Sequence, residues 1–346
     1  MSSFADAFAP APGYVNASTM GLPPIAVVEA MHHGLAQWQA GTASPEVYDA
    51  AVTSARSSFG ALVGVPPQNV SVGPAASTFA GMVAASLPDG ARVVAIADDF
   101  TSILFPFMVQ EQACRGIVVE LVSGSELASA ITAEVDLVVF SLAQSRDGAL
   151  VDLDPVLDAA DGVGAQTFCD ITQAAGWLSV EAARFDMTVC AAYKWLCQPR
   201  GAAYFTASDE AMSALTPVYA GWYAGESVWE SVYGPLMHLA RDARRFDVSP
   251  SWLTWVGAAA AGALFAHEPV ESMGAHGIGL ANELRTRIGL VQGASPVISL
   301  PDPHGTKARA CAGAGVTAAS RGGALRIGFH LWNTPADVDL VEGALR

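Results

Sequence analysis

Lysine is almost absent from this sequence of 346 residues, which contains only Lys194 and Lys307. Lys194 stands in the apolar string VCAAYKWLCQPRGAAYF, directly after a run that is typical of a β-strand. A lysine in apolar surroundings loses its proton more easily than one on the surface, and its neutral amine can form a Schiff base with a carbonyl compound. In a chain so poor in lysine, this placement indicates that an amine is needed there.

Positive charge is scarce as well, since 17 Lys and Arg stand against 33 Asp and Glu and the formal net charge is −16. No cluster of basic residues is present, which argues against a nucleic acid or an anionic membrane as a partner. The five cysteines are odd in number and include no CxxC pair. They predict reduced thiols in a reducing compartment, with neither a disulfide framework nor a metal site.

Long apolar runs are also missing. The first residues have no basic start and no apolar stretch of signal-peptide length, so export is not predicted. The uncharged run 248 to 266 contains Pro250 and many Gly and Ala, which favours a packed helix over a membrane span. We therefore expect a cytoplasmic protein with no membrane partner, whose 52% hydrophobic residues form a large core, interpreted as two domains.

Short apolar runs typical of strands alternate with helical or loop stretches. They are VSVG (70 to 73), VVAIA (93 to 97), IVVEL (117 to 121), DLVVF (136 to 140), TFCD (167 to 170), MTVCA (187 to 191) and AAYF (202 to 205). This alternation predicts an α/β fold with a mostly parallel seven-stranded sheet covered on both faces. Ligands of such sheets bind beyond the carboxyl ends of strands, where both Asp170 and Lys194 fall.

The string DITQ, from Asp170 to Gln173, suits pyridoxal phosphate. This cofactor requires an amine for its aldehyde, a carboxylate facing its pyridine nitrogen and a donor for its phenolic oxygen. Lys194, Asp170 and Gln173 can supply these three groups in that order. Asp and Gln at this spacing are common by chance, but a lysine one strand later makes the cofactor the favoured interpretation.

Nearly the whole chain resembles the class V aminotransferase family of fold type I pyridoxal phosphate enzymes, which includes cysteine desulfurases, kynureninases and isopenicillin N epimerase-like proteins. The matching segments are YVNASTMGLPP (14 to 24), GPAASTFAG (73 to 81), DDFTSILFPF (98 to 107), SLAQSRDGALVDL (141 to 153), DITQAAGW (170 to 177), YKWLCQPRG (193 to 201), RFDVSPSW (245 to 252) and LRIGFHLWNTPADVD (325 to 339). The resemblance implies a homodimer. Residues 21–239 are expected to form the large cofactor-binding domain, and residues 1–20 and 240–346 a smaller α+β domain.

The cofactor phosphate is expected at the start of the helix after VSVGP, because helix N-termini bind anions. Ala76, Ser77 and Thr78 match the family's phosphate-binding turn, although Ser and Thr also cap ordinary helices. Tyr193 matches a phosphate-binding tyrosine of kynureninases. Ser251 resembles the small hydroxyl residue that a neighbouring subunit contributes.

Phe100 corresponds in the family to a ring that stacks on the cofactor. Desulfurases carry His there, which also moves protons, whereas a phenyl ring can only stack. Gln173 stands where kynureninases carry His, which disfavours kynureninase itself.

Arg326, in LRIGFHLWNT, matches the family's arginine for the substrate carboxylate, to which a guanidinium makes a planar, two-toothed contact. Asn16 and Gln144 match positions of the same pocket, and Trp222 is expected to roof it or to pack nearby. Arg321 is the alternative to Arg326, although its RGG context is typical of a tight turn.

Cys311 precedes Arg326 by 15 residues, the spacing of the persulfide cysteine in one group of desulfurases. The string TKARACAGAG instead predicts a helix end stopped by glycine. We interpret the chain as a pyridoxal phosphate enzyme acting on an amino acid, most simply an aminotransferase. The alternatives are a lyase that releases a thiol or sulfenate from a cysteine conjugate, a desulfurase, and, ranked lowest, a non-catalytic cofactor-binding regulatory protein.

Overall fold

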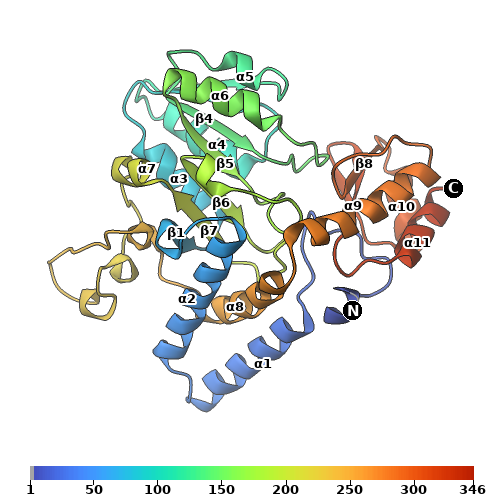
Figure 1. Ribbon diagram of the computed structural model, residues 1–346, viewed down its shortest axis with the longest axis horizontal. Coiled ribbons are helices and arrows are strands. Elements are labelled where there is room, and N and C mark those ends of the chain that lie inside the picture. The colour runs from blue at the N-terminus through green and yellow to red at the C-terminus, as the bar shows by residue number, and fades with distance from the viewer. Residues whose placement is uncertain (1–3) are drawn as a thin grey trace.

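The computed structural model describes residues 4–346, with His267 described by its backbone alone, and contains two sheets (Figure 1). The larger has seven strands in the order β1-β7-β6-β5-β4-β2-β3. These strands are β1 (Val70–Gly73), β2 (Arg92–Ile96), β3 (Val118–Val122), β4 (Leu137–Ser141), β5 (Gln166–Asp170), β6 (Met187–Ala191) and β7 (Ala203–Ala207). All seven predicted strands are confirmed, with ends that agree within two residues.

The large sheet is mostly parallel, as predicted. Strands β3, β2, β4, β5 and β6 pair in parallel, whereas β7 runs antiparallel to both β1 and β6. Successive residues of a strand point to opposite faces, and in β2 both sets are buried: Val93 and Ala95 in one core, Val94 and Ile96 in the other. Burial on both faces explains why these strands are continuous apolar runs.

Helices cover both faces of this sheet. The α-helices around it are α1 (Ile25–Ala40), α2 (Pro45–Leu62), α3 (Ala76–Ser86), α4 (Thr101–Gln112), α5 (Leu127–Ala130), α6 (Leu153–Val163), α7 (Asp209–Ala214) and α8 (Trp252–His267). Side chains of α3, α4 and α7 enter one core, and those of α2, α5, α6 and α8 enter the other. None of the helices within residues 4–346 is long and apolar enough to cross a membrane.

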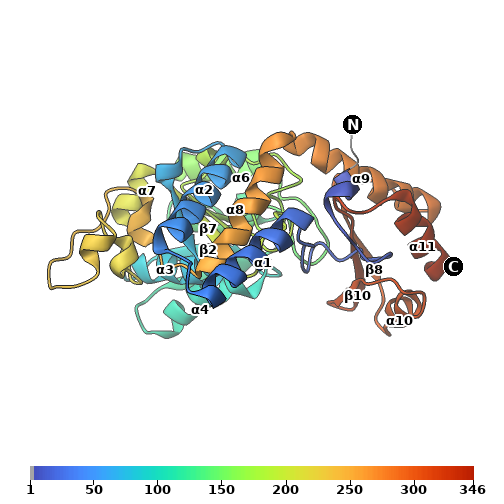
Figure 2. The same ribbon diagram turned by 90° about the horizontal axis from the view of Figure 1, so that it is seen from below.

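A smaller antiparallel sheet lies beside the first body, at the right of Figures 1 and 2. It has the order β8-β10-β9, formed by β8 (Val297–Pro301), β9 (Ala319–Arg321) and β10 (Ala324–Gly328), and is accompanied by α9 (Val270–Arg287), α10 (Thr306–Gly313) and α11 (Pro335–Leu345). The N-terminal segment joins it through parallel bridges from Tyr14 to Thr317 and from Asn16 to Gly328. Residues 1–3 of the predicted segment lie outside the described part of the chain.

Helix α8 packs against α1 and α2 of the first body rather than on the small sheet (Figure 2). The approach is close, because a Cβ on Gly262 would lie 2.8 Å from the side chain of Ser58 on α2. Just before α8, the buried carboxylate of Asp247 pairs with Arg56 of α2 at 2.6 Å and accepts from the backbone N of Val72 on β1 at 2.8 Å. The domain boundary between residues 239 and 240 therefore stays a prediction, because α8, from the range assigned to the small domain, packs on helices of the large domain.

Candidate active site

Lys194 lies in the tight turn that follows strand β6. Its side chain is buried, and its Nζ lies 5.1 Å from the ring centre of Phe100 and 5.8 Å from that of Tyr193. Burial lowers the pKa of the Lys194 amine to about 8, against the opposing influence of the Asp170 carboxylate. The turn therefore presents an amine that loses its proton far more readily than a surface lysine, as a nucleophile requires.

Asp170 is the last residue of β5, the parallel neighbour of β6. Burial raises the pKa of its carboxyl to about 6, although hydrogen bonds from Thr172 and the charge of Lys194 lower it. The backbone N of Thr172 donates to Oδ1 of Asp170 at 2.8 Å, and Oγ1 of Thr172 accepts from the backbone N of Ala191 at 2.8 Å. Thr172 thus fixes the carboxylate relative to the strand that leads to the lysine.

A cavity of about 150 Å³ lies in front of these two groups. Its wall is formed by Pro74, Ala75, Ala76, Ser77, Phe100, Ser102, Asp170, Thr172, Ala191, Tyr193, Lys194 and Arg200. Six of the residues predicted for the site, Ala76, Ser77, Phe100, Asp170, Tyr193 and Lys194, therefore meet at one place. Thr78 lies one residue further along α3 and does not line the cavity.

The start of α3 is open to an anion. Ala75, at the N-cap position, has an extended backbone, and no side chain caps the helix there. The first N–H groups of a helix lack partners within the helix and carry partial positive charge. This end of the cavity therefore suits a phosphate.

Phe100 is held in place by the side chain of the preceding residue, Asp99. Its backbone N donates to Oδ1 of the buried Asp99 at 2.6 Å, and Oδ2 of Asp99 accepts from the backbone N of Ser141 at 2.6 Å. Gln144 belongs to the same network, because its Nε2 donates to Oδ2 of Asp99 at 3.4 Å and to the Ser141 carbonyl at 3.2 Å. Phe100 is 41% exposed and lines the cavity, so a flat ligand there can reach its ring.

Gln173 is buried but does not line the cavity. Its Nε2 donates to the Ser18 carbonyl at 3.0 Å and to Oγ of Ser145 at 3.1 Å, while its Oε1 accepts from Nε1 of Trp195 at 2.8 Å. Both amide hydrogens are thus used within the protein. Donation to a phenolic oxygen stays a prediction, and it requires one of these two contacts to be exchanged.

Arg326, on β10, is buried beside polar groups that are neutral. Its Nη1 donates to the backbone carbonyl of Ser145 and to Oγ of the same residue, the latter at 3.2 Å. Its Nη2 donates to Oγ1 of Thr19 at 2.8 Å. Burial lowers the pKa of its guanidinium to about 10. Nε of Arg326, Oδ1 of Asn16 and Oγ of Ser18 are buried without a hydrogen-bond partner among the described residues.

This arrangement fits a cationic pocket for an anion, because a buried guanidinium with neutral partners is stabilised by an incoming carboxylate. Its charge is also among the causes that lower the pKa of Lys194, so the pocket is electrostatically coupled to the lysine. Sequence reasoning identified Arg326 and Asn16 but missed Thr19 and Ser145. Both belong to segments already matched to the family, which was the available signal.

Two further residues predicted for the site do not line the lysine cavity. Trp222 belongs to a short turn of helix, Trp222–Ala224, and its ring packs against those of Tyr223 and Trp229. Ser251 is exposed at the N-cap of α8, where its Oγ accepts from Oγ1 of Thr254 at 3.2 Å. Neither lines the cavity of its own chain, so their roles stay predictions.

Cys311 lies near the end of helix α10 and is 1% exposed. Burial raises the pKa of its thiol. The prediction that this cysteine is carried by a helix rather than by an exposed loop is confirmed. A buried, protonated thiol is a weak nucleophile.

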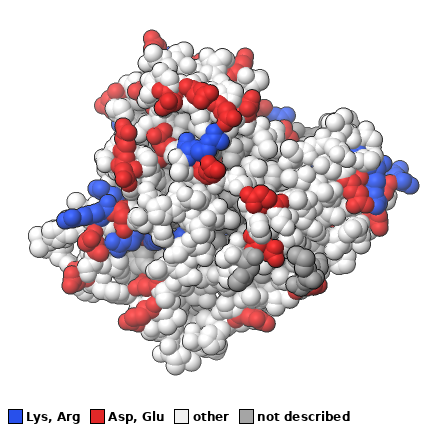
Figure 3. Space-filling view, viewed as in Figure 1, with Lys and Arg blue, Asp and Glu red and all other residues white. Residues whose placement is uncertain are grey.

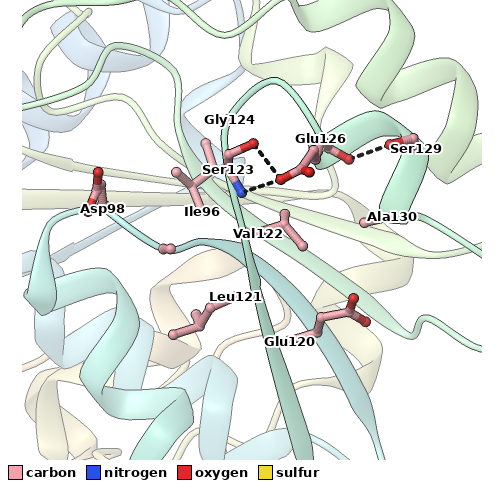
Figure 4. A pocket seen from close by; sticks show the side chains of 11 residues that line it. Ile96, Asp98, Glu120, Leu121, Val122, Ser123, Gly124, Glu126, Ser129 and Ala130 are labelled. Atoms are coloured by element: carbon pink, nitrogen blue, oxygen red, sulfur yellow. Dashed lines mark hydrogen bonds between the residues drawn. The ribbon is translucent and has the colours of Figure 1, made fainter.

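A second, open pocket lies beside β2 and β3, and Figure 4 shows Asp98, Glu120 and Glu126 around it. Glu126 accepts from the backbone N and Oγ of Ser123 at 3.2 and 2.6 Å, which closes the turn after β3. Acidic side chains are spread over much of the face seen in Figure 3. This pocket shares no residue with the lysine cavity, and its acidic wall does not suit a phosphate.

Comparison with known proteins agrees with the geometry. The family model described as aminotransferase class-V matches residues 15–306. A kynureninase of Deinococcus radiodurans is 25% identical over 252 residues, which are 68% of this chain and 60% of that protein. The matched region thus spans about 60% of the length of that relative.

Solved structures share the fold. The cysteine desulfurase CsdA of Escherichia coli has a TM-score of 0.84 at 18% identity, covering 99% of this chain and 96% of that chain. A cystine C–S lyase, C-DES, in complex with its reaction product cysteine persulfide has a TM-score of 0.87 at 16% identity, covering 96% and 97%.

The cavity also passes a chemical test for pyridoxal phosphate. A buried amine, a buried carboxylate, a partly exposed aromatic residue and an uncapped helix start are the groups that its aldehyde, ring nitrogen, ring face and phosphate require. The family match covers most of the chain, and the predicted fold is the one observed. The protein therefore belongs to the class V aminotransferase family of fold type I enzymes, and pyridoxal phosphate is its cofactor.

Proposed function

We propose that this protein acts on an α-amino acid with a free carboxylate, using Lys194 as the amine that holds the cofactor and later moves the substrate proton. The observation that carries the proposal is the buried guanidinium of Arg326, whose partners Ser145 and Thr19 are neutral and whose Nε has no hydrogen-bond partner among the described residues. An amino acid bound through its carboxylate at Arg326 brings its Cα towards the lysine.

Each side chain has a separate task in this scheme. Asp170 would face the ring nitrogen, where its buried carboxylate gains a counter-charge and keeps the ring protonated. Phe100 would stack on the ring. Lys194 would be the base that removes the proton from Cα, and its lowered pKa suits proton removal near neutral pH. The bound cofactor supplies the electron-accepting ring that stabilises negative charge on Cα.

Among the finer activities we propose transamination first, because it requires no side chain beyond those already named. Lys194 would take the proton from Cα and hold it for return. Elimination from a cysteine conjugate is the second candidate, supported by the lyase named among the structural neighbours. A desulfurase is less favoured, because Cys311 is buried and Phe100 cannot transfer a proton.

A product assay separates the two candidates. The purified protein, loaded with cofactor, is given a panel of amino acids and cysteine conjugates with and without a keto-acid acceptor. Transamination predicts that product forms only with the acceptor. Release of pyruvate and ammonia without acceptor would replace it by elimination, and no reaction of any amino acid would overturn the proposed substrate class.

We further propose a cytoplasmic homodimer. The apolar side chains of Phe105 and Val109 on α4 are 57% and 58% exposed, and with Tyr219 they line a hollow that includes Ser77 of the lysine cavity. An exposed apolar surface next to the active site supports association of two copies there. The cytoplasmic location is supported by the five cysteines, all free within residues 4–346.

A further inference from the structure

Arg200 lines the lysine cavity but has no role in the proposed function. It follows Pro199 in the turn after Lys194. Lys194 and Arg200 are the cations of the cavity wall. The guanidinium carbon of Arg200 lies 4.8 Å from the ring centre of Tyr193. Stacking occupies the face of a guanidinium and leaves its N–H groups at the edge free to donate.

The same cavity contains the other elements of an anion site. The uncapped start of α3 contributes Ala76 and Ser77, and Ser102 adds a second hydroxyl. The carboxylate of the wall, Asp170, is buried at the end of β5 and fits the ring nitrogen instead.

We propose that Arg200 binds the phosphate of pyridoxal phosphate. Tyr193 orients the guanidinium of Arg200, and the N–H groups at the start of α3 donate hydrogen bonds to the same phosphate. Tyr193 then acts on the phosphate through Arg200, as a positioning residue. The inference rests on the proposed place of the cofactor at Lys194. A second anionic group of a substrate is the competing occupant, and the experiment distinguishes it.

The test compares pyridoxal phosphate with pyridoxal, which has the same aldehyde and ring but no phosphate. Cofactor-free protein is titrated with each compound, and binding is followed by quenching of tryptophan fluorescence. The variants are Arg200→Gln and Arg200→Lys. Arg309→Gln is the matched control, because Arg309 is an exposed arginine on α10 and its loss changes the net charge equally.

We expect Arg200→Gln to weaken binding of pyridoxal phosphate by about tenfold, the lower end for a charged hydrogen bond because Arg200 is solvent-exposed. Arg200→Lys should lose less, since it keeps the charge. Pyridoxal should bind wild type and both variants equally, and Arg309→Gln should bind both compounds as wild type does.

Three results would overturn the inference. Unchanged affinity of Arg200→Gln for pyridoxal phosphate excludes a phosphate contact. An equal loss for both compounds shows that the residue acts on the ring or on the fold. Unchanged cofactor affinity with a raised KM for one amino acid assigns Arg200 to the substrate. If wild type binds pyridoxal phosphate no more tightly than Lys194→Ala does, the place of the cofactor at Lys194 is wrong, which is a separate failure.

Discussion

Replacing Arg326 by lysine tests how the substrate is recognised. Arg326 is 3% exposed, and the plane of its guanidinium is set by Ser145 on one nitrogen and Thr19 on the other. Lysine keeps the positive charge but cannot make two parallel hydrogen bonds to a carboxylate. Losing one charged hydrogen bond costs about 1.5–3 kcal/mol, which corresponds to roughly a 10- to 100-fold weaker binding of an amino acid.

The measurement is a titration of the cofactor spectrum with an amino acid and with the amine that its decarboxylation gives. Wild type should prefer the amino acid, and Arg326→Lys should lose most of that preference while it binds the amine unchanged. Arg321→Lys is the control, since Arg321 is an exposed arginine on the neighbouring strand β9. The unsubstituted cofactor spectrum should be the same in all three proteins.

An equal preference for the amino acid in wild type and Arg326→Lys would refute the reasoning. Either another group then reads the carboxylate, or the natural substrate is an amine. A loss in Arg321→Lys of the same size would assign the task to Arg321. Each result changes the substrate class and leaves the cofactor site as described.

The remaining predictions concern the lysine, its carboxylate partner, the buried thiol and the dimer. Borohydride treatment of the yellow protein should fix the cofactor on Lys194, and a label on Lys307 would contradict the site. Attachment of the cofactor to cofactor-free protein should accelerate as the pH rises through about 8, because the Lys194 amine is protonated below this pKa and neutral above it; a rate that is flat between pH 6 and 9 would contradict the lowered pKa. Asp170→Asn retains an acceptor for the Thr172 amide but removes the charge, so turnover should fall by about 100-fold or more, and near-normal turnover would mean that the ring is misplaced. Cys311→Ser should keep most of the activity and lose about 1–3 kcal/mol of unfolding free energy, because a hydroxyl replaces a thiol in a buried place; loss of activity with intact fold and cofactor would favour a desulfurase. Phe105→Glu should shift the protein from dimer to monomer in analytical ultracentrifugation, and a monomeric wild type would remove the dimer proposal.

The parts of the site that could be predicted are local in sequence. Asp170 ends a strand and Lys194 follows one, the apolar runs of both strands are visible in the chain, and parallel strands bring their ends to one edge. Ala76 and Ser77 begin a helix directly after a strand, so they could be placed by the same argument. These positions depend on short-range patterns that burial of the sheet imposes. Phe100 was placed by the resemblance to the family.

The parts that could not be predicted depend on contacts between distant segments. The partners of Arg326 are Ser145 and Thr19, which are 181 and 307 positions away in the chain. Gln173 could be found from its motif, but the use of its amide by Ser18 and Ser145 could not. Hydrogen bonds of this kind depend on how segments far apart in the chain pack together, and the periodicity of apolar residues carries no information about that packing.

The turn around Lys194 is supported by both ends of the chain. The backbone N of Gly21 donates to the Tyr193 carbonyl at 2.9 Å, and a Cβ at Gly21 would collide with the carbonyl oxygen of Lys194. From the other side, Nε2 of His330 contacts the Trp195 carbonyl at 2.8 Å. During synthesis, a ribosome-bound chain that has folded the whole seven-stranded sheet still lacks the His330 contact. The lysine turn is therefore completed late in translation, and firm capture of the cofactor should follow release of the chain rather than accompany folding of the sheet.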